Sequence, residues 1–99
     1  MELLRELHGI FVAEYPKLLS RVREAMTERN GEALGKAAHT IKGMLSNLGA
    51  KSAAEAALRL EKMPAGEGLS GADEAYTVLE REIERFSRAL AALLKETAP

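Results

Sequence analysis

The chain has 99 residues, 46% of them hydrophobic, and a formal net charge of −1 from 14 basic and 15 acidic residues. This length corresponds to one small domain, here 1–99, with a modest core. A nearly neutral charge provides no field that would hold nucleic acid or an anionic membrane. The lack of cysteine excludes disulfides, thiolate catalysis and the common structural zinc sites. No apolar run approaches the ~20 residues of a membrane span, and the N-terminus does not resemble a signal peptide, so we expect a cytoplasmic protein.

The first predicted helix covers roughly residues 2–29. Its apolar side chains repeat at three- and four-residue steps and form one amphipathic stripe, consisting of Phe11, Tyr15, Leu18, Leu19, Val22 and Met26. Proline is tolerated in the first turn of a helix but costs ~3 kcal/mol in its interior. We therefore expect one of two arrangements at Pro16: a short extra N-terminal helix that ends before it, or one helix that bends there.

The second predicted helix covers residues 31–48. Asn30 precedes it and is a good N-cap residue, because its side-chain oxygen can accept a hydrogen bond from a free backbone N–H. Gly49 follows it, at a position where a left-handed residue commonly ends a helix.

The third predicted helix covers residues 53–63 and is followed by a loop at 64–71 that is rich in glycine and proline. Ser52 and Glu55 have the spacing of a capping box. Its expected buried side consists of Ala54, Ala57, Leu58 and Leu60.

The fourth predicted helix covers residues 72–95, with Ser70 and Asp73 as a second capping signature. It carries a long apolar seam, formed by Tyr76, Leu79, Ile83, Phe86, Leu90 and Leu93. No strand pattern appears. Long amphipathic helices joined by short connections predict an all-α, antiparallel four-helix bundle, and four helices can close a bundle within one chain, so we expect a monomer.

The second helix carries the most informative residue, His39. At about 100° per residue, its apolar side chains fall in one sector opposite His39, made of Ala33, Leu34, Ala37, Ala38, Ile41, Met44, Leu45 and Leu48. His39 is therefore predicted to point to solvent. Its own face consists of small and charged residues, namely Glu32, Gly35, Lys36, Lys42, Gly43 and Ser46.

Two glycines lie one turn on either side of His39. Gly35 and Gly43 each cost the helix about 1 kcal/mol relative to alanine, which suggests that space beside the imidazole is needed for a partner. Close packing against another helix is the alternative, although both glycines lie away from the apolar stripe. Lys36 and Lys42, three residues on either side of His39, are neighbours of it on the helix surface and could receive a phosphoryl group.

Two segments, 38–43 (AHTIKG) and 47–50 (NLGA), closely resemble the phosphoacceptor signature of histidine phosphotransfer (HPt) domains. The similarity extends from about Leu4 to Leu94 in helix order and length, and Leu58 and Glu61 match the usual continuation of the family. Met44 departs from the small residue that many members carry. The resemblance implies a four-helix bundle that carries a phosphoryl group between the aspartates of response-regulator receiver domains.

The resemblance also assigns roles to matching residues. His39 would be phosphorylated, Lys42 would help to neutralise the phosphoryl group, and Gly43 would leave room for the receiver. Lys36 and Ser46 would make secondary contacts, and Gly35 would belong to the same binding surface. The domain would hold no cofactor of its own, because magnesium belongs to the receiver. We expect the chain to be a domain of a larger bacterial signalling protein, such as a hybrid sensor kinase, and a free-standing shuttle is the alternative.

Exposed apolar residues of the first helix would complete the receiver surface, with Ile10 or Phe11 as candidates. The main alternative function is a non-catalytic helical interaction module in which His39 is incidental. A histidine kinase dimerisation domain is a further relative, although its bundle needs two chains.

A metal-binding bundle is not expected, because it needs Glu-x-x-His pairs, whereas Lys36 precedes His39 and Arg5 precedes the surface residue His8. A nucleotide-binding loop is also missing, so the domain is not expected to be an enzyme.

Overall fold

The computed structural model describes residues 2–63 and 71–97. Over these residues the chain is helical and contains no strand. The four helices are α1 (Glu2–Thr27), α2 (Gly31–Asn47), α3 (Lys51–Glu61) and α4 (Ala72–Thr97). None of them, within the part that is described, combines the length and apolar character that a membrane span requires. The all-α class and the number of helices agree with the prediction.

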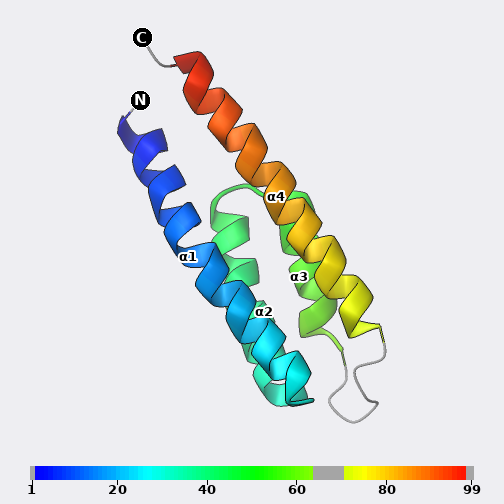
Figure 1. The fold of residues 1–99 in the computed structure, drawn as a ribbon. Helices are drawn as coiled ribbons and strands as arrows, with labels where there is room; N and C mark the ends of the chain where they lie inside the picture. Colours follow the sequence, from blue (N-terminus) through cyan, green and yellow to red (C-terminus); the bar gives the residue numbers. More distant parts are fainter. Residues whose placement is uncertain (1, 64–70, 98–99) are drawn as a thin grey trace.

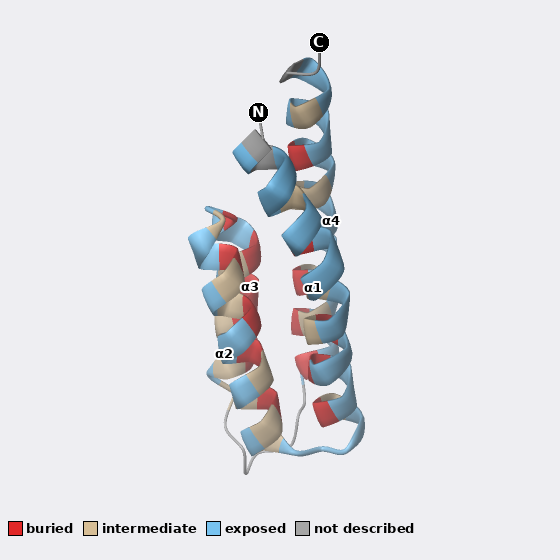
Figure 2. Cartoon of the chain, turned by 90° about the vertical axis from the view of Figure 1, so that its left-hand side faces the viewer, coloured by how far each residue is buried: buried red, intermediate tan, exposed pale blue. Residues whose placement is uncertain are grey.

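The helices form an antiparallel bundle of two layers (Figure 1). One layer contains α1 and α4, and the other contains α2 and α3. The helices α1 and α3 each pack against both α2 and α4. The bundle is long and narrow, with principal extents of 53 × 18 × 17 Å. The layers differ in length, because α1 and α4 extend well beyond α2 and α3 at the end where the two termini lie (Figures 1 and 2).

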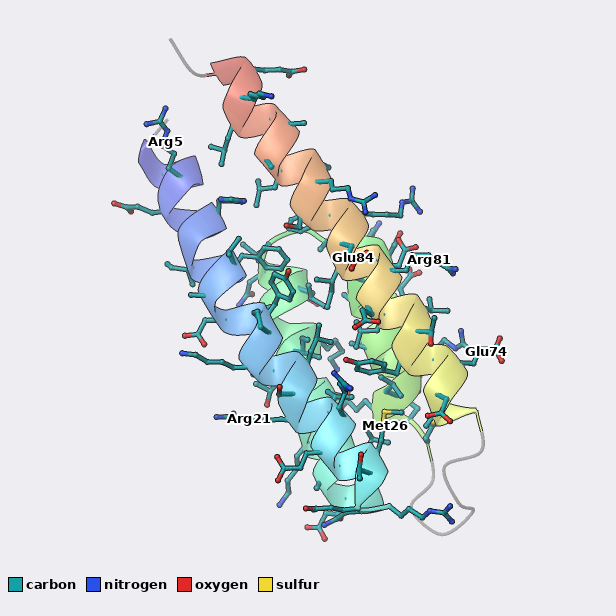
Figure 3. All side chains as sticks on the ribbon, in the orientation of Figure 1. Arg5, Arg21, Met26, Glu74, Arg81 and Glu84 are labelled. Atoms are coloured by element: carbon teal, nitrogen blue, oxygen red, sulfur yellow. The ribbon has the colours of Figure 1, made fainter. Side chains whose placement is uncertain are left out.

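The core lies between the two layers, where the buried faces of the helices meet (Figure 2). Its largest fully buried side chains come from all four helices and are Phe11, Val22, Leu34, Ile41, Leu45, Leu60, Leu79 and Ile83. Phe11 connects α1 to α4 through an edge-to-face contact with Phe86, at 5.4 Å between ring centroids. Alanine supplies most of the buried side of α3, which lets that helix approach its neighbours closely. The outer surfaces are charged, as the exposed side chains of Arg21, Glu74 and Arg81 illustrate (Figure 3).

The first helix is a single continuous helix that contains Pro16 in its interior. The expectation of a short separate helix before Pro16 is therefore wrong. Pro16 is exposed, so the carbonyl that loses its intrahelical hydrogen bond is on the solvent side, where water can bind it. His8, expected on the surface, is half-buried.

The first helix ends at Thr27, two residues before its predicted end. Arg29 adopts the left-handed conformation, with φ of 55°. The N–H groups of Arg29 and Asn30 donate to the carbonyls of Met26 and Ala25, at 3.1 and 3.0 Å. This is a Schellman ending with arginine at the position that glycine usually occupies.

The predicted start of α2 and both of its predicted end signals, Asn30 and Gly49, are confirmed, and the helix ends at Asn47, one residue before the predicted end. The Asn30 side chain accepts a hydrogen bond from the N–H of Ala33 at 3.0 Å. Gly49 has φ of 77°, and the N–H of Ala50 donates to the carbonyl of Leu45 at 2.9 Å. The opposed faces of α2 are also as predicted, since Leu34, Ala38, Ile41 and Leu45 are buried.

The third helix runs from Lys51 to Glu61, so both ends of the predicted range 53–63 are wrong by two residues. Ser52 is inside the helix, and the N-cap residue is Ala50, which makes no side-chain capping bond. The Ser52–Glu55 capping box is thus not formed. Only Ala50, the N-cap residue, lies between Gly49 and the first residue of α3. The buried residues are Ala53, Ala56, Ala57 and Leu60, whereas Ala54 and Leu58 are only half-buried.

The fourth helix begins at Ala72 as predicted and ends two residues later than expected, at Thr97. The carbonyl of Gly71 accepts the first helical hydrogen bond from Ala75, at 3.0 Å. Residues 64–70, which include most of the predicted loop and the proposed cap Ser70, are outside the described residues.

Candidate phosphoacceptor site

His39 is in the middle of α2, on the face opposite the buried stripe. Its side chain is 68% exposed, whereas its neighbour Ala38 and the nearby Ile41 are fully buried. The same helical periodicity that buries these two residues therefore places the imidazole in solvent. This confirms the predicted orientation of His39.

Glu61, the last residue of α3, contacts the imidazole. Its Oε2 atom is 2.8 Å from Nδ1 of His39. A carboxylate can only accept a hydrogen bond, so Nδ1 carries a proton, and in the neutral form of the ring the lone pair is then on Nε2. The carboxylate thereby orients the imidazole and turns its Nε2 side away from Glu61.

Lys42 contacts the other oxygen of the same carboxylate. Its Nζ atom is 2.7 Å from Oε1 of Glu61, and both side chains are only about one-quarter exposed, at 26% and 25%. The hydrogen bonds from Lys42 and then His39 lower the pKa of Glu61 below its ordinary value of 4.5. Glu61 is therefore ionised at neutral pH and holds the two residues of α2 in one cluster.

The other predicted lysine has a different environment. Lys36 is on the solvent side of α2 and pairs with Glu32, one turn earlier, at 3.3 Å. Both side chains are largely exposed, so the pair contributes little to stability. The hydroxyl of Thr40 donates to the backbone carbonyl of Lys36 at 3.0 Å. Lys36 is thus free to reorient toward an incoming anion without breaking a buried contact.

A shallow depression lies beside His39, at the junction of α2 with the end of α3. It is lined by Gly31, Glu32, Gly35, Lys36, His39, Thr40 and Glu61. At Gly35, an added Cβ would be 3.8 Å from the backbone oxygen of Glu61, an ordinary contact distance. The absence of a side chain there keeps the depression open.

Gly43 is one turn beyond His39 and has a more open environment. A Cβ at this position would meet no atom of the described structure within 4 Å. Close helix packing therefore does not explain this glycine. Ser46 continues the same face toward the end of α2 and is exposed, so it lies beside the His39–Glu61–Lys42 cluster rather than within it.

The two candidate surface residues of α1 have opposite environments. Phe11 is fully buried, so its predicted role on the partner surface is wrong. Ile10 is 59% exposed. Neighbouring residues on a helix point about 100° apart, and only the packing of α1 against the other helices decides which of the two enters the core.

A family model for the Hpt domain matches residues 6–89 of the chain. The chain belongs to the Hpt family. Comparisons with curated proteins and with solved structures give no match. The Hpt family consists of phosphocarrier modules of phosphorelays that interact with response-regulator receivers.

One member of this Hpt site was not predicted in its structural role. Glu61 was noted only for its match to the family pattern, yet it contacts both His39 and Lys42. It comes 22 residues after His39 and on another helix, so no local spacing in the sequence indicates the contact. Apart from the family pattern, the available signal is an acidic residue at the end of the helix that follows the histidine helix. Among the described residues, no cluster suited to a metal ion is present.

Proposed function

We propose that His39 accepts a phosphoryl group from the phosphorylated aspartate of a receiver domain and passes it to the aspartate of another receiver. The observation that carries this proposal is the placement of the imidazole: it is exposed, and its Nδ1 is bound to Glu61, so that in the neutral ring Nε2 carries the lone pair. A neutral ring nitrogen with a free lone pair is a competent nucleophile.

The transfer is a displacement at phosphorus. Nε2 of His39 attacks the phosphorus atom, an N–P bond forms, the bond between phosphorus and the aspartyl oxygen breaks, and the aspartate leaves as a carboxylate. No proton needs to leave Nε2, because it carries none. Transfer to the next receiver is the same step in reverse, with the second aspartate as the nucleophile.

Glu61 supports this step through charge. When Nε2 is phosphorylated while Nδ1 keeps its proton, the ring becomes cationic, and the nearby carboxylate stabilises that charge. The phosphorylated ring remains a good leaving group for the return step. Glu61 does not touch the phosphoryl group and is a positioning residue.

The remaining residues act on the phosphoryl group and the partner. An ammonium has three donors, and Glu61 engages Lys42 through one of its oxygens, so further donors of Lys42 can neutralise phosphoryl oxygens. Lys36 adds a second cation after it leaves Glu32. Gly35 and Gly43 give the receiver access to the ring, and Ser46 lies at the edge of its footprint.

Magnesium belongs to the receiver in this proposal, where acidic residues hold it beside the aspartate. Because the net charge of this chain is only −1, receiver choice depends on shape and short-range contacts rather than on long-range steering. The donor and acceptor are thus selected at the surface around His39.

The test is to follow the transfer of label from a panel of phosphorylated receivers, with magnesium, to the wild type and to His39→Gln. We expect an acid-labile and base-stable label on the wild type and none on the variant. Equal labelling of His39→Gln would show that another residue accepts the phosphoryl group. Failure of the whole panel would favour a plain interaction module.

A further inference from the structure

At the end of the α1–α4 layer that holds the two termini, no described residue of α2 or α3 covers the apolar face of the two helices. Beyond the ends of α2 and α3, the two longer helices continue side by side (Figures 1 and 2). No described side chain of α1 before Phe11 is buried. Yet this segment carries Leu3 at 67% and Ile10 at 59% exposure, and Leu7 is also exposed. We call the exposed set on the two helices the apical face, formed by Leu3, Leu7, Ile10, Ala89 and Leu93.

The apical face of α1 continues the face that packs on α2 lower in the bundle. Leu3 and Arg21 are five helical turns apart, as are Leu7 and Ala25, so each pair points in the same direction. Arg21 and Ala25 line the groove between α1 and α2, opposite alanines of α2. The leucines therefore point to where α2 would lie if it were longer.

The same relationship holds on α4. Phe86 lines a groove with the first residues of α3, and Leu93 is two turns further along the same stripe. Leu93 is 46% exposed, and the exposed Ala89 lies between the two. The apical face of α4 thus points to where α3 would lie if it were longer. The layer is half of a four-helix bundle over this length.

We propose that the apical face binds the apical face of a second copy of this chain. The two copies would be related by a two-fold axis that runs between the layers, perpendicular to the helices. This axis places α1 antiparallel to α1 of the second copy, and α4 antiparallel to α4 of the second copy. At this end of the molecule the long α1–α4 layer projects beyond the short α2–α3 layer, so the end has the shape of a step. Two such steps are complementary, because each long layer fills the space above the short layer of the other.

The charge distribution agrees with this self-association. The residues of the apical face carry no charge, while Arg5, near the end of α1 (Figure 3), points away from the leucine stripe and can remain in solvent. The face is small, since a few turns of two helices bury well under the ~800 Å² per partner of a standard interface. We therefore expect a dimer of modest affinity, with a dissociation constant on the order of 0.1–1 mM. His39 remains exposed in both copies, because it is on α2, outside this face.

The experiment is sedimentation equilibrium of the whole chain over about 10 µM to 2 mM, a range that brackets this affinity, for the wild type, Leu7→Glu and Val12→Glu. Val12 is a matched control, because it is an exposed apolar residue of α1, at 44%, on a different side of the helix from the leucine stripe. We expect the mean mass of the wild type and Val12→Glu to rise toward the dimer, and that of Leu7→Glu to remain monomeric at unchanged helicity.

A second measurement uses cysteine variants, so it does not require a glutamate to be placed in the interface. The chain contains no cysteine, so Leu7→Cys can form a disulfide only between two copies. Because Leu7 lies near the two-fold axis, we expect it to cross-link much faster than Val12→Cys under mild oxidation. A wild type that stays monomeric throughout the range, or equal cross-linking of both variants, would overturn the proposal. Unchanged mass together with slower labelling of Leu7→Glu by a receiver would instead assign the apical face to the receiver.

Discussion

Glu61 binds Lys42 and His39 through different oxygens of one carboxylate, Oε1 to the ammonium at 2.7 Å and Oε2 to the imidazole at 2.8 Å. The end of α3 is thereby tied to two residues of α2 that are three positions apart. Any change in the charge of Glu61 acts on both residues together. Substitution of Glu61 therefore tests the whole cluster, and its effects on phosphotransfer and on folding can be measured separately.

Replacing Glu61 with Gln keeps the size of the side chain and removes its charge. We expect phosphotransfer to His39 to slow by on the order of tenfold, since the cationic ring loses its counter-charge and its orienting acceptor. Glu55→Gln is the control, because it changes an exposed carboxylate of the same helix. The rate of label transfer from a phosphorylated receiver measures the effect. A folded Glu61→Gln protein with the wild-type rate would remove Glu61 from the mechanism.

The ionisation of Glu61 also links stability to pH. Because folding lowers its pKa below 4.5, the folded state favours the ionised carboxylate, and this contribution is fully present above pH 4.5. It is lost as the pH falls through the lowered pKa. We expect the difference in unfolding free energy between wild type and Glu61→Gln to persist down to about pH 4.5 and to shrink in stronger acid. Urea denaturation across this range measures it, and a difference that does not change with acidification would argue against the ion pair.

Gly43 allows stability and function to be separated. A Cβ at Gly43 meets nothing within 4 Å, so Gly43→Ala should stabilise the protein by about 0.5–1 kcal/mol through helix propensity. In the proposed function it should also slow phosphotransfer, because the new methyl group faces the receiver. Gly9→Ala is the matched control, an equally open helical glycine on α1 that should gain stability without a change in transfer rate. Equal transfer rates in both variants would indicate that Gly43 is not at the receiver interface.

Substitutions at the ends of two helices should change stability in opposite directions. Arg29 and Gly49 both adopt left-handed conformations, with φ of 55° and 77°. This conformation costs a non-glycine residue roughly 1 kcal/mol. We expect Arg29→Gly to stabilise the protein by up to about 1 kcal/mol and Gly49→Ala to destabilise it by about 1 kcal/mol or more. Thermal and chemical denaturation would measure both, and a destabilised Arg29→Gly variant would mean that the arginine side chain contributes contacts that outweigh its backbone cost.

The helix periods and the face of His39 could be predicted because they depend on local repetition. Leu34, Ala38, Ile41 and Leu45 recur at helical spacing, and any packing that buries them exposes His39. The capping of α2 by Asn30 and Gly49 was predicted for the same reason, since it involves residues within one or two turns. The Ser52–Glu55 capping box does not form because α3 begins at Lys51, directly after the N-cap residue Ala50, so Ser52 is already inside the helix.

The sequence by itself determined the helical class, the orientation of His39 and the Hpt pattern around it. Only the tertiary structure decided that Glu61 joins His39 to Lys42, that Phe11 is buried while Ile10 is exposed, and that neither α2 nor α3 reaches far enough to cover Leu3 and Leu7. These outcomes depend on how far each helix extends and how it is rotated against the next. A periodic pattern reports which residues share a face of one helix, but contacts between helices arise from the packing of all four together.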